Sequence, residues 1–74
     1  MIARILIWNL YDSMTTVEEL RAHLPELPEG DRWISNDSHE RFGLITFGDE
    51  LPDLGEIPQL IGSEPVVAEE FDVE

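Results

Sequence analysis

The chain has 74 residues and no cysteine, which limits it to one small domain, residues 1–74, without disulfides or thiolate metal sites. Its 17 acidic residues are balanced by only four arginines and no lysine. The resulting formal net charge of −13 argues against binding to nucleic acids or anionic membranes. A domain of this size is marginally stable by itself, so we expect a second copy to supply part of its stability.

Neither the histidines nor the start of the chain indicates a special site or destination. His23 and His39 have a spacing that matches no metal-binding motif, and we expect neither a metal nor another cofactor. The apolar run that begins at residue 2 has no basic region before it and no small-residue cleavage site after it, unlike a secretory signal. It is also far shorter than the roughly 20 residues that cross a bilayer. We therefore expect a cytoplasmic protein.

The first predicted element is a strand over residues 2–11, rich in the branched and aromatic side chains that favour strands. Apolar side chains occupy both of its faces, with Ile5 and Ile7 on one face and Leu6 and Trp8 on the other. A strand that is apolar on both faces is typical of the centre of a sheet.

A helix is expected next, after a short turn. Thr15 and Glu18 have the spacing of a capping box, and Thr16 and Glu19 offer the same box one residue later. Pro25 disfavours helical backbone in the residue before it, so the helix should stop there. Four leucine and valine side chains fall at helical spacing and form the expected buried stripe: Val17, Leu20, Leu24 and Leu27.

The middle of the chain predicts a hairpin. Residues 28–31 have the composition of a turn. Residues 32–35 form a short, rather polar strand of the kind found at a sheet edge. After a polar loop at residues 36–40, the strand at residues 41–47 again carries apolar side chains on both faces, which indicates a second central strand.

The last third of the chain predicts a weak helix and a final strand. Residues 51–61 could form one or two helical turns, capped by Asp53, limited by Pro58 and ended by Gly62. Residues 65–73 form the final strand. Three apolar side chains of that strand share one face: Val67, Phe71 and Val73.

The element order βαββαβ predicts an α+β protein with the ferredoxin-like arrangement, a four-stranded antiparallel sheet with two helices on one face. Strands one and three are then central and strands two and four are edges, which agrees with their apolar content. The second face of the sheet would carry large apolar side chains without a cover. We therefore expect a homodimer in which two sheets pack face to face.

Three segments of the chain resemble a known group of proteins: residues 5–10, residues 16–20 and residues 43–47. Together they resemble the dimeric α+β barrel proteins, which include the stress-responsive A/B-barrel proteins and the antibiotic-biosynthesis-type monooxygenases. The resemblance implies a ferredoxin-like subunit and a dimer whose sheets enclose a cavity. In the monooxygenases it would also imply cofactor-independent oxidation of an aromatic substrate in that cavity.

Several large or polar-tipped side chains are candidates for a ligand pocket or an interface. Asn9 or Trp8 could line a dimer cavity, where the amide could hold a substrate carbonyl; the alternative is packing for Trp8 and a strand-end role for Asn9. Trp33 could anchor an interface or belong to the core. His39 would need an oriented partner to act as a base, and a solvated loop histidine is the simpler interpretation. The full set comprises Trp8, Asn9, Tyr11, Trp33, His39 and Phe47.

Charged residues offer two weaker hypotheses. Acids at positions 49, 50 and 53 could bind calcium, but they lack the spacing of an EF-hand loop and fit a solvated helix cap. Arg32 and Arg41 could grip an anionic ligand, although nearby acids should pair with them instead. No phosphate-binding glycine loop, nucleophile elbow or catalytic triad is present.

These observations predict a small acidic homodimer with a binding or association role rather than a catalytic one. One alternative is a monooxygenase-like or other small-molecule enzyme of the dimeric barrel type. Another is an acidic inhibitor that mimics nucleic acid and blocks a basic protein. The expected partners are accordingly a second copy through the sheet face, another protein, or a small apolar ligand.

Overall fold

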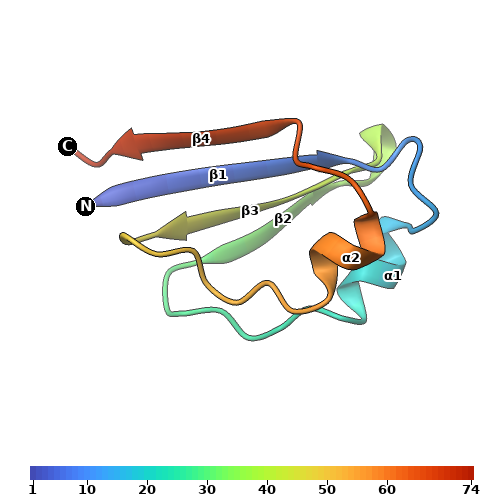
Figure 1. Ribbon diagram of the computed structural model, residues 1–74, viewed down its shortest axis with the longest axis horizontal. Coiled ribbons are helices and arrows are strands. Elements are labelled where there is room, and N and C mark those ends of the chain that lie inside the picture. The colour runs from blue at the N-terminus through green and yellow to red at the C-terminus, as the bar shows by residue number, and fades with distance from the viewer.

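The computed structural model of the protein describes residues 1–74 and shows an α+β architecture. Four strands form one antiparallel sheet in the order β2-β3-β1-β4, with β1 and β3 in the centre as predicted (Figure 1). This order is compatible with a ferredoxin-like arrangement. In chain order the elements are β1 (Ile2–Asn9), α1 (Val17–Arg21), β2 (Arg32–Asn36), the 3₁₀ turn η1 (Asp37–His39), β3 (Arg41–Phe47), α2 (Ile57–Ile61) and β4 (Val67–Asp72).

The register of the central pair determines which side chains share a face. Leu6 of β1 lies opposite Leu44 of β3, and Ile5 lies opposite Ile45. Since directly opposed residues point to the same side of a sheet, the two leucines lie on one face and the two isoleucines on the other. The predicted assignment of alternate residues to opposite faces is therefore confirmed for β1 and β3.

The hydrophobic core lies on the face of the sheet that carries the leucines. Side chains from β1, β3 and both helices meet there, and both helices lie beside the same end of the sheet (Figure 1). We call this the helix face. Its buried apolar residues are Leu6, Trp8, Leu10, Val17, Leu20, Phe42, Leu44, Ile57 and Ile61.

Helix α1 begins one residue later than its first predicted capping box. Thr16 is the N-cap, and its hydroxyl accepts a 3.2 Å hydrogen bond from the Glu19 amide. The Thr15 hydroxyl instead donates to the Glu19 carboxylate at 3.0 Å. The helix also ends at Arg21, earlier than Pro25 requires, because the amide of Ala22 bonds the carbonyl three residues before it and tightens the last turn.

Helix α2 is shorter than the predicted span of residues 51–61 and covers only Ile57–Ile61. Asp53 does not cap it: its carboxylate accepts a 2.8 Å hydrogen bond from the Gly55 amide in the preceding loop. Pro58 lies in the first turn, where its missing N–H leaves no intrahelical bond unmade. Gly62 ends the helix with φ of 77°, as predicted.

The ends of three strands also differ from the predicted bounds. β1 stops at Asn9 because the Asn9 side-chain oxygen accepts a 3.0 Å hydrogen bond from the Tyr11 amide and turns the chain. β4 occupies only Val67–Asp72 of the predicted residues 65–73, whereas β2 extends one residue further than predicted, to Asn36.

A buried carboxylate connects the turn before β2 to the end of β3. Asp31 is only 4% exposed, and its two oxygens accept hydrogen bonds from the Thr46 hydroxyl at 2.6 Å and from the Phe47 amide at 3.1 Å. The predicted turn at residues 28–31 delivers it there, with Gly30 at φ of 93° and a bond from the Asp31 amide to the Pro28 carbonyl. Sequence patterns did not identify this contact.

Candidate functional site

The face of the sheet opposite the helices is apolar and uncovered. The hydrophobic side chains of both helices, and several from the loops, such as Leu24 and Leu54, pack into the core on the helix face. The other face therefore has no cover within the chain, and Phe47 and Phe71 remain 42% and 45% exposed. We call it the open face. Its apolar strand residues are Ala3, Ile5, Ile7, Ile34, Ile45, Phe47, Val67 and Phe71.

A hollow of about 240 Å³ interrupts the open face around Gly43. A Cβ atom at this glycine would lie 2.5 Å from the Leu6 carbonyl oxygen and 2.7 Å from Ile7 Cδ1, so no larger residue fits without movement. Ile34 and Val67 border the hollow on the two edge strands. The result is a concave spot in the middle of the open face, lined by these apolar side chains and also by Ser35, Asn36 and Arg41.

Charge is distributed unevenly between the two faces. The chain has 17 acidic residues, yet Glu69 is the only carboxylate that the strands place on the open face. Glu70 and Asp72 of the same strand point to the opposite side, where Glu70 binds Arg4 at 2.8 Å. The open face is thus nearly free of the negative charge that dominates the rest of the molecule.

Two of the four arginines lie on the open face, and neither binds a carboxylate. Arg32 donates only to the Asp31 carbonyl oxygen at 2.7 Å, and Arg41 has no hydrogen-bond or ion-pair partner. The prediction that Asp31, Asp37 and Glu40 pair with them is wrong, since neither arginine forms an ion pair. The Asp31 carboxylate is engaged with β3, and Asp37 pairs with Arg21 at 3.0 Å.

The structure separates the six predicted site residues instead of gathering them. Asn9 and Phe47 lie on the open face, whereas Trp8 and Trp33 lie on the helix face. Tyr11 lies in an exposed turn after β1, and His39 is an exposed residue of the 3₁₀ turn η1. The His39 ring contacts Ser38 and Asn36 side chains at 3.2 and 3.3 Å but no carboxylate that could orient it as a base. These residues do not form one catalytic arrangement.

Trp33 contributes to the packing of the helix face. Its ring stacks on Phe42 with 5.6 Å between centroids, and its indole nitrogen donates to the Pro25 carbonyl at 3.4 Å. It is only partly buried, at the edge of the core. Core packing is therefore the interpretation that these contacts support for Trp33.

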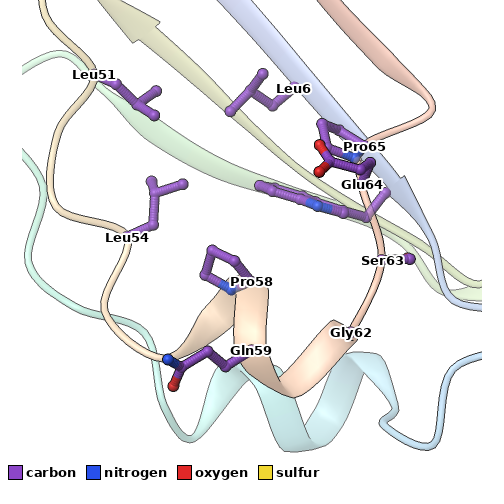
Figure 2. A pocket seen from close by; sticks show the side chains of 10 residues that line it. Leu6, Leu51, Leu54, Pro58, Gln59, Gly62, Ser63, Glu64 and Pro65 are labelled. Atoms are coloured by element: carbon purple, nitrogen blue, oxygen red, sulfur yellow. The ribbon is translucent and has the colours of Figure 1, made fainter.

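Trp8 lines a wider hollow of about 590 Å³ on the helix face. Leu51 and Leu54 lie on one side of it, Glu64 and Pro65 on the other, and Pro58 projects from α2 (Figure 2). Trp8 itself is 2% exposed, and its indole N–H has no partner. The hollow marks the part of the helix face that two five-residue helices do not cover.

No three histidine or acidic side chains converge in a way that could hold a metal ion. None of the helices has the length and apolar character needed to cross a membrane.

Comparison with models of protein families and with curated protein sequences finds no match for this chain. The role of the protein is therefore inferred from the open face and the residues that surround it.

Two features of the open face were missed in the sequence. The hollow at Gly43 depends on the register of all four strands, which no local pattern specifies. The position of Glu69 on the open face could have been predicted from the sequence. Side chains alternate along residues 67–72, which places Glu69 on the same face as Val67 and Phe71.

Proposed function

We propose that this protein is a ferredoxin-like subunit that acts as a homodimeric association module, with two copies packed through their open faces. The observation that carries the proposal is the composition of that face. It holds eight apolar strand residues and one strand carboxylate in a chain with a net charge of −13. Carboxylates are common elsewhere in the chain, so a face that stayed exposed to water would be expected to carry them too. Their scarcity on this apolar face is typical of a surface that is covered by a partner.

The size of the chain supports the same proposal. Only 13 of 74 residues are buried in a single copy. A core this small supplies little free energy to offset the conformational entropy that the chain loses on folding. Burying one aliphatic or phenyl side chain contributes about 1.5–3 kcal/mol, so covering the open face would add substantially to stability. Sheet-on-sheet packing is the geometry that two such faces adopt.

Light scattering with a matched pair of variants tests the proposal. We expect the native chain to have twice its 8.5 kDa mass at micromolar concentration. Val67→Glu places a charge on the open face and should give a folded monomer, because an unpaired charge would be buried in the interface. Val66→Glu changes the adjacent valine, which is 62% exposed and precedes β4, and should leave the dimer intact.

Either of two results would refute the proposal. A native chain that remains monomeric up to millimolar concentration would show that water, not a second copy, covers the open face. A dimer that tolerates Val67→Glu as well as Val66→Glu would place the interface elsewhere. Circular dichroism of each variant separates loss of the dimer from loss of the fold.

A second candidate function, binding of a small apolar ligand between the sheets, is favoured by the hollow at Gly43. A compound held there should raise the melting temperature of the native chain. That effect should disappear in Val67→Trp, in which the larger side chain occupies the hollow. Catalysis of the monooxygenase type and mimicry of nucleic acid stay predictions without a supporting arrangement of side chains.

A further inference from the structure

The residues of the open face form rows that run across the strands. The pairing of β2 with β3, β3 with β1 and β1 with β4 fixes which residues share each row. Three rows matter for packing, and we write each in the order of the sheet from β2 to β4: Arg32–Ile45–Ile5–Glu69, then Ile34–Gly43–Ile7–Val67, and at the end of the sheet Phe47–Ala3–Phe71 without a β2 member.

We propose that the two copies are related by a two-fold axis that runs parallel to the strands, so that Arg32 of each copy pairs with Glu69 of the other. This inference rests on the proposed function, because it specifies the geometry of that dimer. Rotation about such an axis reverses the order of the strands in the second copy relative to the first. Each row keeps its position along the strand direction. β2 then lies over β4 of the second copy, β3 lies over β1, and each row faces itself in reverse.

The sizes of the central side chains fit this arrangement. Reversing the third row places Phe47 over Ala3 of the second copy. Reversing the second row places Ile7 over Gly43 of the second copy, beside the hollow that Gly43 helps to line. The third row therefore places a large side chain over a small one on each side of the axis, which favours close packing, whereas the first row places Ile45 over Ile5.

The charges fit the arrangement as well. Arg32 and Glu69 occupy opposite ends of the first row, and Arg32 has no carboxylate partner within its own chain. Reversal brings opposite charges together twice in each dimer. Packed sheets cross at about 30°, which displaces edge strands lying about 7 Å from the axis by about 4 Å. The flexible arginine and glutamate side chains can span that displacement.

The other two-fold arrangement lacks this complementarity. An axis that lies across the strands would place β2 over β2 and β4 over β4. Arg32 and Glu69 could then never meet, and each would be covered by the same edge strand of the second copy. Burial of charges without partners is costly, so the face of this protein favours the axis along the strands.

A cycle of charge reversals tests the pairing through the dimer dissociation constant, measured by analytical ultracentrifugation. Arg32→Glu and Glu69→Arg should each weaken the dimer by about tenfold, since each puts two like-charge contacts into the interface. The double variant restores opposite charges and should return the constant to within about threefold of the native value. Arg21→Glu is the control for Arg32→Glu, because it changes net charge equally at an exposed site on α1.

The outcomes distinguish this inference from the proposed function. A native dimer that responds to Arg32→Glu no more than to Arg21→Glu, without recovery in the double variant, would overturn the axis and leave the dimer standing. A monomeric native chain would refute both proposals. Recovery in the double variant supports the axis along the strands, because the other arrangement brings no reversed pair together.

Chemical cross-linking gives an independent measurement. The native chain has no cysteine, so only the introduced cysteines can react. Packed sheets lie about 10 Å apart, beyond the reach of a disulfide, so a short bismaleimide is the suitable reagent. Arg32→Cys and Glu69→Cys should yield a cross-linked dimer only when the two variants are mixed. Efficient cross-linking of Arg32→Cys with itself would instead demonstrate the axis across the strands.

Discussion

The two faces of this sheet are built from the same strands, yet they differ in what covers them. On the helix face, Leu44 and Leu20 are fully buried by two short helices and the loops around them. On the open face, comparable side chains such as Phe47 and Phe71 remain nearly half exposed. Sequence alternation alone does not predict the difference, because it makes both faces apolar. What distinguishes them is that the chain has only enough helix to cover one.

The largest expected contrast is between neighbours on β3. Leu44→Ala should destabilise the protein by about 2–5 kcal/mol at every protein concentration, because it leaves a cavity in the core. If the proposed dimer forms, Ile45→Ala should lower the urea midpoint mainly at high protein concentration. Urea titrations over a range of protein concentrations measure both. Equal losses of unfolding free energy for the two variants in dilute solution would show that both faces are buried within a single subunit.

Asp31→Ala tests how the helix face is closed. The substitution leaves the Thr46 hydroxyl and the Phe47 amide without their partner, so we expect a loss of about 2–4 kcal/mol. Asp31→Asn preserves an acceptor oxygen and should cost less than the alanine variant. If chemical denaturation finds both variants as stable as the native chain, the buried carboxylate does not hold the turn to β3.

Gly43→Ala tests the centre of the open face. The added methyl group would meet the Leu6 carbonyl oxygen and Ile7 Cδ1, so we expect a destabilisation of about 1–3 kcal/mol in the isolated subunit. It should also weaken the proposed dimer, because the displaced Ile7 side chain changes the shape of the open face. Glycine at position 48 has open space around its Cα but a φ of 108°, so Gly48→Ala is a control for backbone strain without crowding.

The smallest expected effect concerns the helix that covers one face. Thr16→Ala removes the N-cap oxygen of α1 and should cost about 1 kcal/mol. Thr15→Ala removes the bond to the Glu19 carboxylate but leaves the cap intact, so we expect a smaller loss. Thermal unfolding of the two variants measures the difference, and a larger loss for Thr15→Ala would contradict the assignment of the cap.

Local patterns predicted the elements well where one signal dominated. The β3 bounds and the central positions of β1 and β3 are as predicted, because apolar residues on both faces of a strand indicate the middle of a sheet. The end of α2 followed from Gly62, which can adopt positive φ without strain. These features depend on a few consecutive residues, so the sequence alone was enough.

Features that depend on distant partners were predicted poorly. In the sequence Asp31 is an ordinary turn residue, and only the fold brings its carboxylate to β3. The sequence also predicts that nearby acids pair with Arg32, but those acids bind other groups. Both helices are shorter than their stripes predicted, because leucines such as Leu24 and Leu54 pack from loops instead of from helical turns. Hydrophobic spacing identifies what is buried more reliably than it identifies the backbone that buries it.

The position of β4 has a consequence for how the protein behaves at high concentration. It is an edge strand, all of its residues are exposed, and the backbone groups along its outer side are unpaired. Such an edge can template the addition of strands from other molecules and start a fibre. Three of its six residues, Glu69, Glu70 and Asp72, are acidic, so two such edges repel each other. In molar salt the range of that repulsion falls to about 3 Å. Under those conditions we expect aggregation to begin at β4.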